Sequence, residues 1–352
     1  MFEDDKKHRP FSLGEGNGGM GPEDRLLSSL PKVELHLHLD CSLSYEVVNK
    51  IDPSVTEEIY RRDFIAPAKC VNLADFLTRA VKGFSLMQKK EQLELVVHDL
   101  FKQLVADNVL YAEFRFAPLQ HLQKGLTLFE VVDAVEKATA AAVKQTGLEA
   151  RIILCTLRHY TAEQSMETVK LVEQFNGTYV AGFDIAADEA GFAIDNHIAA
   201  FEYAKQKNIH CTAHAGEARG ADSVWETLQY FGPSRIGHGA RSSEDPKLVA
   251  HLKKHHIHLE ICPTCNVQIN IYNEYKDHPV DKLKKAGVSL NINTDCRTIV
   301  DINLNREYDK LKDTFGWTKQ DFYDCNVNAL KAAFIPETLK TTLMAKLTAG
   351  YK

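Results

Sequence analysis

The stretch "VELHLHLD" at residues 33–40 has the alternating pattern of a buried strand, yet it ends in polar side chains. Side chains two positions apart in a strand point to the same side, about 6–7 Å apart. His36 and His38 therefore share one side of the strand, and Asp40 follows two residues later. The pattern predicts a strand whose last residues serve chemistry as well as packing.

Seven further apolar runs of strand length follow along the chain. With the first, they lie at 32–39, 109–117, 151–157, 180–186, 208–214, 235–238, 257–262 and 288–294. The segments between them carry apolar residues every three or four positions, which is typical of amphipathic helices. Strands separated by helices pair in parallel through right-handed crossovers, and eight such units close most naturally into a (β/α)8 TIM barrel.

The chain of 352 residues fits one such barrel. Residues 1–24, rich in glycine and charge, predict a flexible N-terminal tail, and 25–352 predict a single barrel domain. The stretch 43–108 between the first two strands is too long for a single crossover helix. We expect it to form several helices that lie over the barrel mouth.

Composition narrows the class of protein. The hydrophobic fraction of 44% and the charged fraction of 26% are those of a soluble globular protein, and the net charge of −6 favours no nucleic-acid partner. No apolar run is long enough for a membrane span or a signal peptide. The 8 cysteines are too sparse for a disulfide scaffold, so we expect reduced thiols and a cytoplasmic protein. The sequence does not define the oligomeric state.

Functional side chains of such barrels lie where the strands end, at the C-terminal face. The ends of the fourth, fifth, sixth and eighth predicted strands are unusually polar. These ends carry Asp184, Asp188, Glu189, His214, Glu217, His238, Asn293, Thr294 and Asp295. We therefore expect the functional site at this face.

Three histidines and an aspartate among these residues predict a metal site. A lone histidine at a strand end is more often a hydrogen-bonded core residue than a ligand. However, His36, His38, His214 and Asp295 all fall at one face of one predicted barrel. Neutral imidazoles and a carboxylate are the ligands that zinc takes in a catalytic site, so this set favours one zinc ion.

Glu217 and His238 predict what the metal does. Glu217 follows His214 by three residues in the turn "HAGE", and His238 lies between two glycines. A carboxyl group beside a cation can shuttle protons, and a histidine can orient or deprotonate a water molecule. Alternatively, Glu217 is a first-turn acid of the following helix and His238 a core histidine. Together with a metal, the pair predicts hydrolytic attack on a carbon whose leaving group needs a proton.

The motifs "PKVELHLHLD", "TAHAGE", "RIGHG" and "NTD" occur in the order and spacing of the adenosine deaminase family, which the chain resembles from about residue 30 to its end. The resemblance implies a zinc-dependent aminohydrolase on a (β/α)8 barrel that converts adenosine to inosine and ammonia. It implies that His36, His38, His214 and Asp295 bind zinc. Likewise, Glu217 would protonate purine N1, His238 would activate and orient the hydroxide, and Asp40 would bind the ribose 5′-hydroxyl.

Three positions depart from the family pattern. Cys41 replaces a glycine after Asp40, and Ala187 in "AADE" replaces a glycine whose N–H contacts the purine edge. Cys296 replaces a second aspartate, the residue that holds purine N7 in the family. A thiol is a weaker hydrogen-bond partner, so N7 recognition would fall to Cys296 or to a water, while Arg297 would offer the substrate a charge that the usual family sequence lacks.

Several alternatives compete with this interpretation. Two-metal amidohydrolases need a bridging lysine on strand four, which "VAGFDIAAD" lacks. The "CPTC" at 262–265 suggests the other zinc deaminase architecture, but its proline follows the first cysteine, so Cys262 and Cys265 fit ordinary thiols. Within the family, the substrate could be adenine, N6-methyl-AMP or a 5′-modified adenosine. A nucleoside-binding scaffold without activity would predict the loss of Glu217 or of a zinc ligand.

Overall fold

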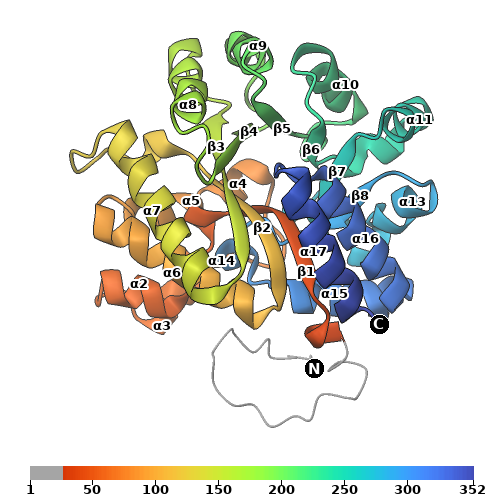
Figure 1. Ribbon diagram of the computed structural model, residues 1–352, viewed down its shortest axis with the longest axis horizontal. Helices are drawn as coiled ribbons and strands as arrows, with labels where there is room; N and C mark the ends of the chain where they lie inside the picture. Colours follow the sequence, from red (N-terminus) through yellow and green to blue (C-terminus); the bar gives the residue numbers. More distant parts are fainter. Residues whose placement is uncertain (1–26) are drawn as a thin grey trace, which may run out of the picture.

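The computed structural model describes residues 27–352, and its centre is a barrel of eight parallel strands (Figure 1). Each strand pairs with the next one in the chain, which confirms the predicted (β/α)8 topology. The strands are β1 (Lys32–His38), β2 (Val109–Phe116), β3 (Glu149–Leu157), β4 (Val180–Ala186), β5 (His210–Ala215), β6 (Arg235–His238), β7 (His258–Ile261) and β8 (Leu290–Ile292).

The barrel closes between β1 and the segment just after β8. Leu37 and Asp295 form an isolated parallel bridge. The amide of His38 donates to the carbonyl of Asp295 at 2.8 Å, and the amide of Asp295 donates to the carbonyl of His36 at 3.0 Å. The seam of the barrel therefore runs through three of the four predicted metal ligands.

Amphipathic helices surround the strands, and in Figure 1 α7 to α11 form an arc outside them. Their ends follow ordinary capping rules: α7, for example, begins with a capping box between Thr127 and Glu130 and ends at Gly147 with a φ of 73°. The helices after β2 are α7 (Leu128–Thr146), α8 (Ala162–Gln174), α9 (Ile198–Gln206), α10 (Ala221–Tyr230), α11 (Pro246–His255), α12 (Pro263–Gln268), α13 (Val280–Lys285), α14 (Arg297–Val300), α15 (Leu304–Phe315), α16 (Lys319–Ala332) and α17 (Glu337–Gly350).

The predicted insertion after β1 consists of several helices. They are α2 (Tyr45–Ile51), α3 (Glu57–Asp63), α4 (Leu73–Leu77), α5 (Ala80–Ser85) and α6 (Lys90–Ala106). Helices α4 and α5 line the pocket at the barrel mouth, while α6 packs against α7. Helix α5 packs against the short turn η1 (Leu39–Cys41) through Gly83, where an added Cβ would lie 2.2 Å from the carbonyl oxygen of Asp40. The chain needs glycine there because the two backbones touch.

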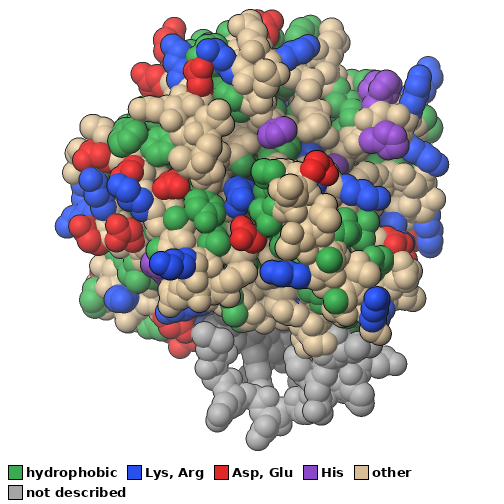
Figure 2. All heavy atoms as spheres, viewed as in Figure 1, with side chains coloured by type: hydrophobic (Ala, Val, Ile, Leu, Met, Phe, Trp, Pro, Cys, Tyr) green, Lys and Arg blue, Asp and Glu red, His purple; other side chains and the backbone are tan. Residues whose placement is uncertain are grey.

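Charged side chains of both signs are spread over the face in Figure 2. Within residues 27–352, the longest apolar helices are still too short or too polar to cross a membrane. The predicted tail at 1–24 and the start of the predicted domain at 25 fall outside the described residues, and the single-domain assignment stays a prediction.

Candidate metal and catalytic site

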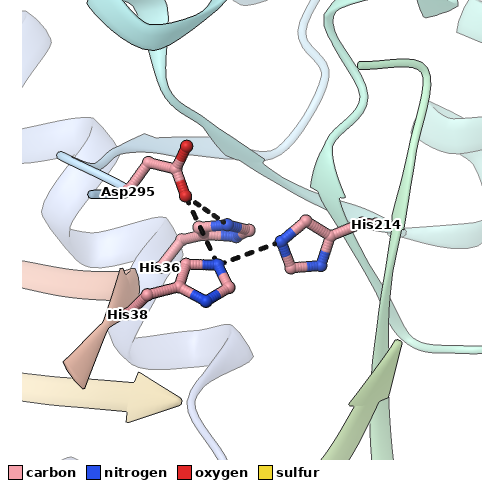
Figure 3. Close-up of side chains that lie close together, drawn as sticks. All are labelled: His36, His38, His214 and Asp295. Carbon is pink, nitrogen blue, oxygen red and sulfur yellow. Dashed lines mark hydrogen bonds and ion pairs between the residues drawn. The ribbon is translucent and has the colours of Figure 1, made fainter. Parts of the chain in front are cut away.

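Four side chains from three places in the chain converge at the C-terminal end of the barrel (Figure 3). His36 and His38 come from β1, His214 comes from β5, and Asp295 follows β8. One ligand atom from each lies within 4.8 Å of the others. Asp295 Oδ1 is 3.4 Å from the Nε2 atoms of both His36 and His38, and the Nε2 atoms of His38 and His214 are 3.2 Å apart.

This donor set fits one ion of borderline softness. Burial, followed by the nearby Arg115, holds the pKa of His36 well below its usual value, so its ring is neutral. His36 Nε2 is buried and has no hydrogen-bond partner, as a lone pair directed at a cation would be. Three imidazole nitrogens and one carboxylate with an open position are typical of catalytic zinc. Two further candidate groups, built on His238, share members with this one and belong to the same centre.

Two buried carboxylates orient the ligand rings from behind. His36 Nδ1 lies 2.7 Å from Glu260 Oε2, and His214 Nδ1 lies 3.1 Å from Asp184 Oδ2. Each ring donates its Nδ1 proton outward, which leaves an Nε2 lone pair that could bind a metal ion. Asp184 is therefore committed to His214 rather than to a second metal.

Arg115 joins these two carboxylates inside the barrel. Its guanidinium lies 2.6 Å from Asp184 and 2.8 Å from Glu260, and all three side chains are fully buried. Burial alone would raise the pKa of Glu260, but Arg115 and Arg235 lower it to about 2, so Glu260 stays ionised. Neither Arg115 nor Glu260 is among the predicted site residues. Their signal in the sequence is a charge inside an apolar strand: Arg115 in "EFRF" and Glu260 in "HLEI".

Glu217 lies in a turn that is held by a second glutamate, Glu189. The Glu189 carboxylate accepts hydrogen bonds from four consecutive backbone amides. These belong to Gly216 at 2.7 Å, Glu217 at 3.0 Å, Ala218 at 2.5 Å and Arg219 at 2.8 Å. Burial, reinforced by the charges of Asp295 and Glu189, raises the pKa of Glu217 well above its usual value. A carboxyl group with a raised pKa suits the role of a general acid.

His238 faces Glu217 from the end of β6. Its Nε2 is buried without a hydrogen-bond partner and lies 3.5 Å from Glu217 Oε1. The backbone of His238 has a φ of 59°, and that of Asp295 has a φ of 63°. Left-handed backbone is strained for residues other than glycine and is common at functional sites.

A pocket of about 400 Å³ opens over this centre. Most of the predicted site residues line it, namely His38, Asp40, Ala187, His214, Glu217, Asp295 and Cys296, while His36 and His238 belong to the candidate metal groups beside it. Helices α4 and α5 add apolar side chains such as Phe76 and Phe84. Burial raises the pKa of Asp40 to about 6. None of the described residues that line this pocket is lysine or arginine.

The three departures from the family pattern have different structural outcomes. Ala187 has a φ of 80°, a conformation that glycine adopts without strain. Cys41 and Cys296 both line the pocket and belong to the same buried cluster. The expectation that Arg297 offers its charge to the substrate is wrong, because its guanidinium lies 2.6 Å from Glu34 and 2.8 Å from Asp107, away from the pocket lining.

The sequence matches known proteins over most of its length. The family model for adenosine deaminase matches residues 31–349. Adenosine deaminase 1 of Streptomyces coelicolor is 34% identical and aligns over 90% of this chain and 85% of its own. The adenosine deaminase of Clostridium perfringens is 33% identical over 90% of this chain and 98% of its own.

Solved structures share the fold at lower identity. An adenine deaminase from Arthrobacter aurescens superposes with a TM-score of 0.84 at 22% identity, covering 91% of this chain and 98% of its own. An amidohydrolase from Burkholderia ambifaria with bound Zn gives 0.87 at 20% identity, covering 97% and 96%. The arabidopsis N6-mAMP deaminase gives 0.83 at 22% identity, covering 92% and 99%.

Proposed function

The chain belongs to the adenosine deaminase family, and from that premise we propose that it is a zinc-dependent aminohydrolase that converts adenosine and 2′-deoxyadenosine to inosine and deoxyinosine plus ammonia. One observation carries the proposal: the buried Glu217 lies beside His238 at a cluster of three histidines and one aspartate. This combination suits hydrolysis in which the ring must be protonated as water attacks.

We propose that His36, His38, His214 and Asp295 hold one zinc ion. Bound there, zinc would lower the pKa of a water molecule to near neutrality and so supply the nucleophile. The outward hydrogen bonds to Glu260 and Asp184 support this assignment, because they fix the ring tautomers that ligation needs. The bound zinc of the Burkholderia amidohydrolase is consistent with it.

In the proposed reaction, Glu217 donates its proton to purine N1. This protonation withdraws electrons from C6, which makes C6 electrophilic. His238 would hold the attacking oxygen through its Nε2, which has no hydrogen-bond partner and lies 3.5 Å from Glu217 Oε1. The two protons of the water balance the reaction. One goes to the amino group, which leaves as ammonia when the C6–N bond breaks, and the other returns to the Glu217 carboxylate.

The pocket lining supports a nucleoside rather than a nucleotide. We propose that Asp40 binds the ribose 5′-hydroxyl, that the Ala187 N–H faces the purine edge, and that Cys296 is a weak partner for N7. A 5′-phosphate would need a cation, but the described lining residues include no lysine or arginine, and Asp40 would repel it. The lesser alternative is another 6-aminopurine, namely adenine, N6-methyl-AMP or a 5′-modified adenosine, since adenine and N6-mAMP deaminases share the fold.

We also propose a cytoplasmic location and a small-molecule purine substrate as the partner. All eight cysteines are free thiols, and seven of them are buried, which suits a reducing compartment.

The test is the ultraviolet spectral change when the zinc-loaded protein is mixed with adenosine, 2′-deoxyadenosine, adenine, AMP or N6-methyl-AMP. The proposal expects conversion of the two nucleosides and no conversion of either nucleotide. Metal analysis of the same sample should give one zinc per chain. Turnover of a nucleotide or of adenine without turnover of adenosine would overturn the substrate assignment, and full activity of the metal-free protein would overturn the zinc assignment.

A further inference from the structure

A buried row of hydrogen bonds runs from the start of α13 to the ring of His238. It passes through the side chains of His278 and Asn266, which are 2% and 0% exposed. We propose that Asn266 and His278 are positioning residues that fix the tautomer of His238, so that its Nε2 carries the proton and points into the site. The proposal rests on the function proposed above.

The first step fixes the ring of His278. The backbone amide of Val280 donates to His278 Nδ1 at 3.1 Å. A neutral imidazole has one N–H, so its proton must lie on Nε2 when Nδ1 is an acceptor. Burial lowers the pKa of His278 to about 3, so the ring is neutral. His278 Nε2 therefore donates, and the Asn266 atom 3.2 Å away must be the oxygen.

The second step carries this orientation to His238. With its oxygen toward His278, Asn266 directs its NH2 group at His238 Nδ1, at 3.1 Å. The opposite amide orientation would point the NH2 group at the N–H of His278, two donors facing each other in a buried place. His238 Nδ1 is therefore an acceptor, and the proton of its neutral ring lies on Nε2.

The Nε2 atom of His238 is therefore a hydrogen-bond donor and cannot act as a base. His238 Nε2 has no partner and lies 3.5 Å from Glu217 Oε1. An N–H at this place can hold an oxygen and stabilise negative charge on it, but it has no lone pair with which to remove a proton. In the proposed reaction His238 thus orients the attacking oxygen, and Asn266 and His278 keep the ring ready to do so.

The test is Asn266→Asp in the full-length, zinc-loaded protein. A carboxylate accepts from both rings, so it should move the His238 proton to Nδ1. Histidine ring 15N spectra distinguish the two tautomers: we expect Nε2–H in the wild type and Nδ1–H in the variant. The kcat for adenosine should fall about 100-fold, as for the loss of one preorganised donor, with KM changed less than threefold. Asn270→Asp, the same change at an exposed position, is the matched control.

If Asn266→Asp does not fold, two variants of His278 test the same hydrogen-bond row. His278→Gln retains an N–H toward Asn266 and should keep the wild-type tautomer and kcat within about threefold. His278→Leu removes that N–H and should populate both tautomers with a lower kcat. An Nδ1–H tautomer in the wild type, or a reversed tautomer with unchanged kcat, would overturn the proposal. A correct tautomer in a protein that does not deaminate adenosine would overturn the proposed function instead.

Discussion

The ring of His36 and the carboxylate of Glu260 form a fully buried pair, with Nδ1 2.7 Å from Oε2. Through this contact the proposed metal centre continues into the charged interior of the barrel, where Glu260 also meets Arg115 and Arg235. The ligand geometry therefore depends on residues that never touch the metal.

Glu260→Gln should lower the zinc affinity by about 10–100-fold, because the amide orients His36 less strongly and two guanidinium groups lose their counter-charge. Competition with a chelating dye measures this affinity. Asp324→Asn, which removes one acidic charge at an exposed position of α16, is the control for the charge change. An unchanged zinc affinity would show that the His36 ring is held by packing alone.

Glu217→Gln should keep zinc and lose about 10²–10⁴-fold in kcat, because the amide cannot donate a proton to the purine ring. Steady-state kinetics beside metal analysis separates the two effects. Glu202→Gln on the exposed face of α9 provides the control. A variant that kept both zinc and full activity would contradict the assignment of Glu217 as the general acid.

Asp40 should give the fold a pH dependence that Asp40→Asn removes. Burial raises the pKa of Asp40 in the folded state to about 6 from 3.8, so the folded protein binds this proton more tightly than the unfolded chain. Stability therefore falls as the pH rises from about 4 to about 6. The variant should match the wild type at pH 4 and be more stable at pH 7, by up to about 3 kcal/mol. Urea unfolding at both pH values measures this, and an equal difference at both would refute it.

Ala187→Gly should stabilise the protein by about 1 kcal/mol. The φ of 80° strains alanine, and relief of that strain exceeds the entropy that glycine adds to the unfolded chain. Thermal unfolding is the measurement, with adenosine turnover expected within about twofold. A lower melting temperature would mean that packing of the Ala187 methyl group stabilises the fold by more than the backbone strain destabilises it.

Gly83→Ala should destabilise the protein by about 1–3 kcal/mol and raise the KM for adenosine, because the added Cβ would press on the backbone of Asp40. Denaturant unfolding and kinetics test the two effects. Ser85→Ala, on the exposed side of the same helix α5, should change neither. Wild-type values for Gly83→Ala would show that α5 can move away from the pocket freely.

The strands and the face at which they end could be predicted from the sequence, because both depend on the local periodicity of apolar residues. The end of each predicted strand lies close to the observed one, and His36, His38, His214 and Asp295 meet because parallel strands end at one face. Arg297 could not be assigned in the same way. Its neighbour Cys296 lines the pocket, but the side chain of Arg297 turns toward Glu34 and Asp107, which lie 263 and 190 residues away in the chain.

The roles of Glu189 and Asn266 could not be predicted from local sequence for a related reason. Glu189 reads as one more acid after β4, and only the folded turn brings four amides to its carboxylate. Asn266 reads as an ordinary polar residue after "CPTC", and its role depends on which atoms His238 and His278 present. Such roles are set by three-dimensional donor and acceptor geometry, which has no period in the sequence.

The seam of the barrel has a consequence for how the protein keeps its shape. The backbone contacts that join β1 to the segment after β8 belong to His36, His38 and Asp295, which are also proposed ligands. An ion bound by these side chains would link β1 to the segment after β8 and so stabilise the closed barrel. Because a ligand that binds only the folded state adds its binding energy to stability, loss of the metal would weaken the closure of the whole barrel as well as its chemistry.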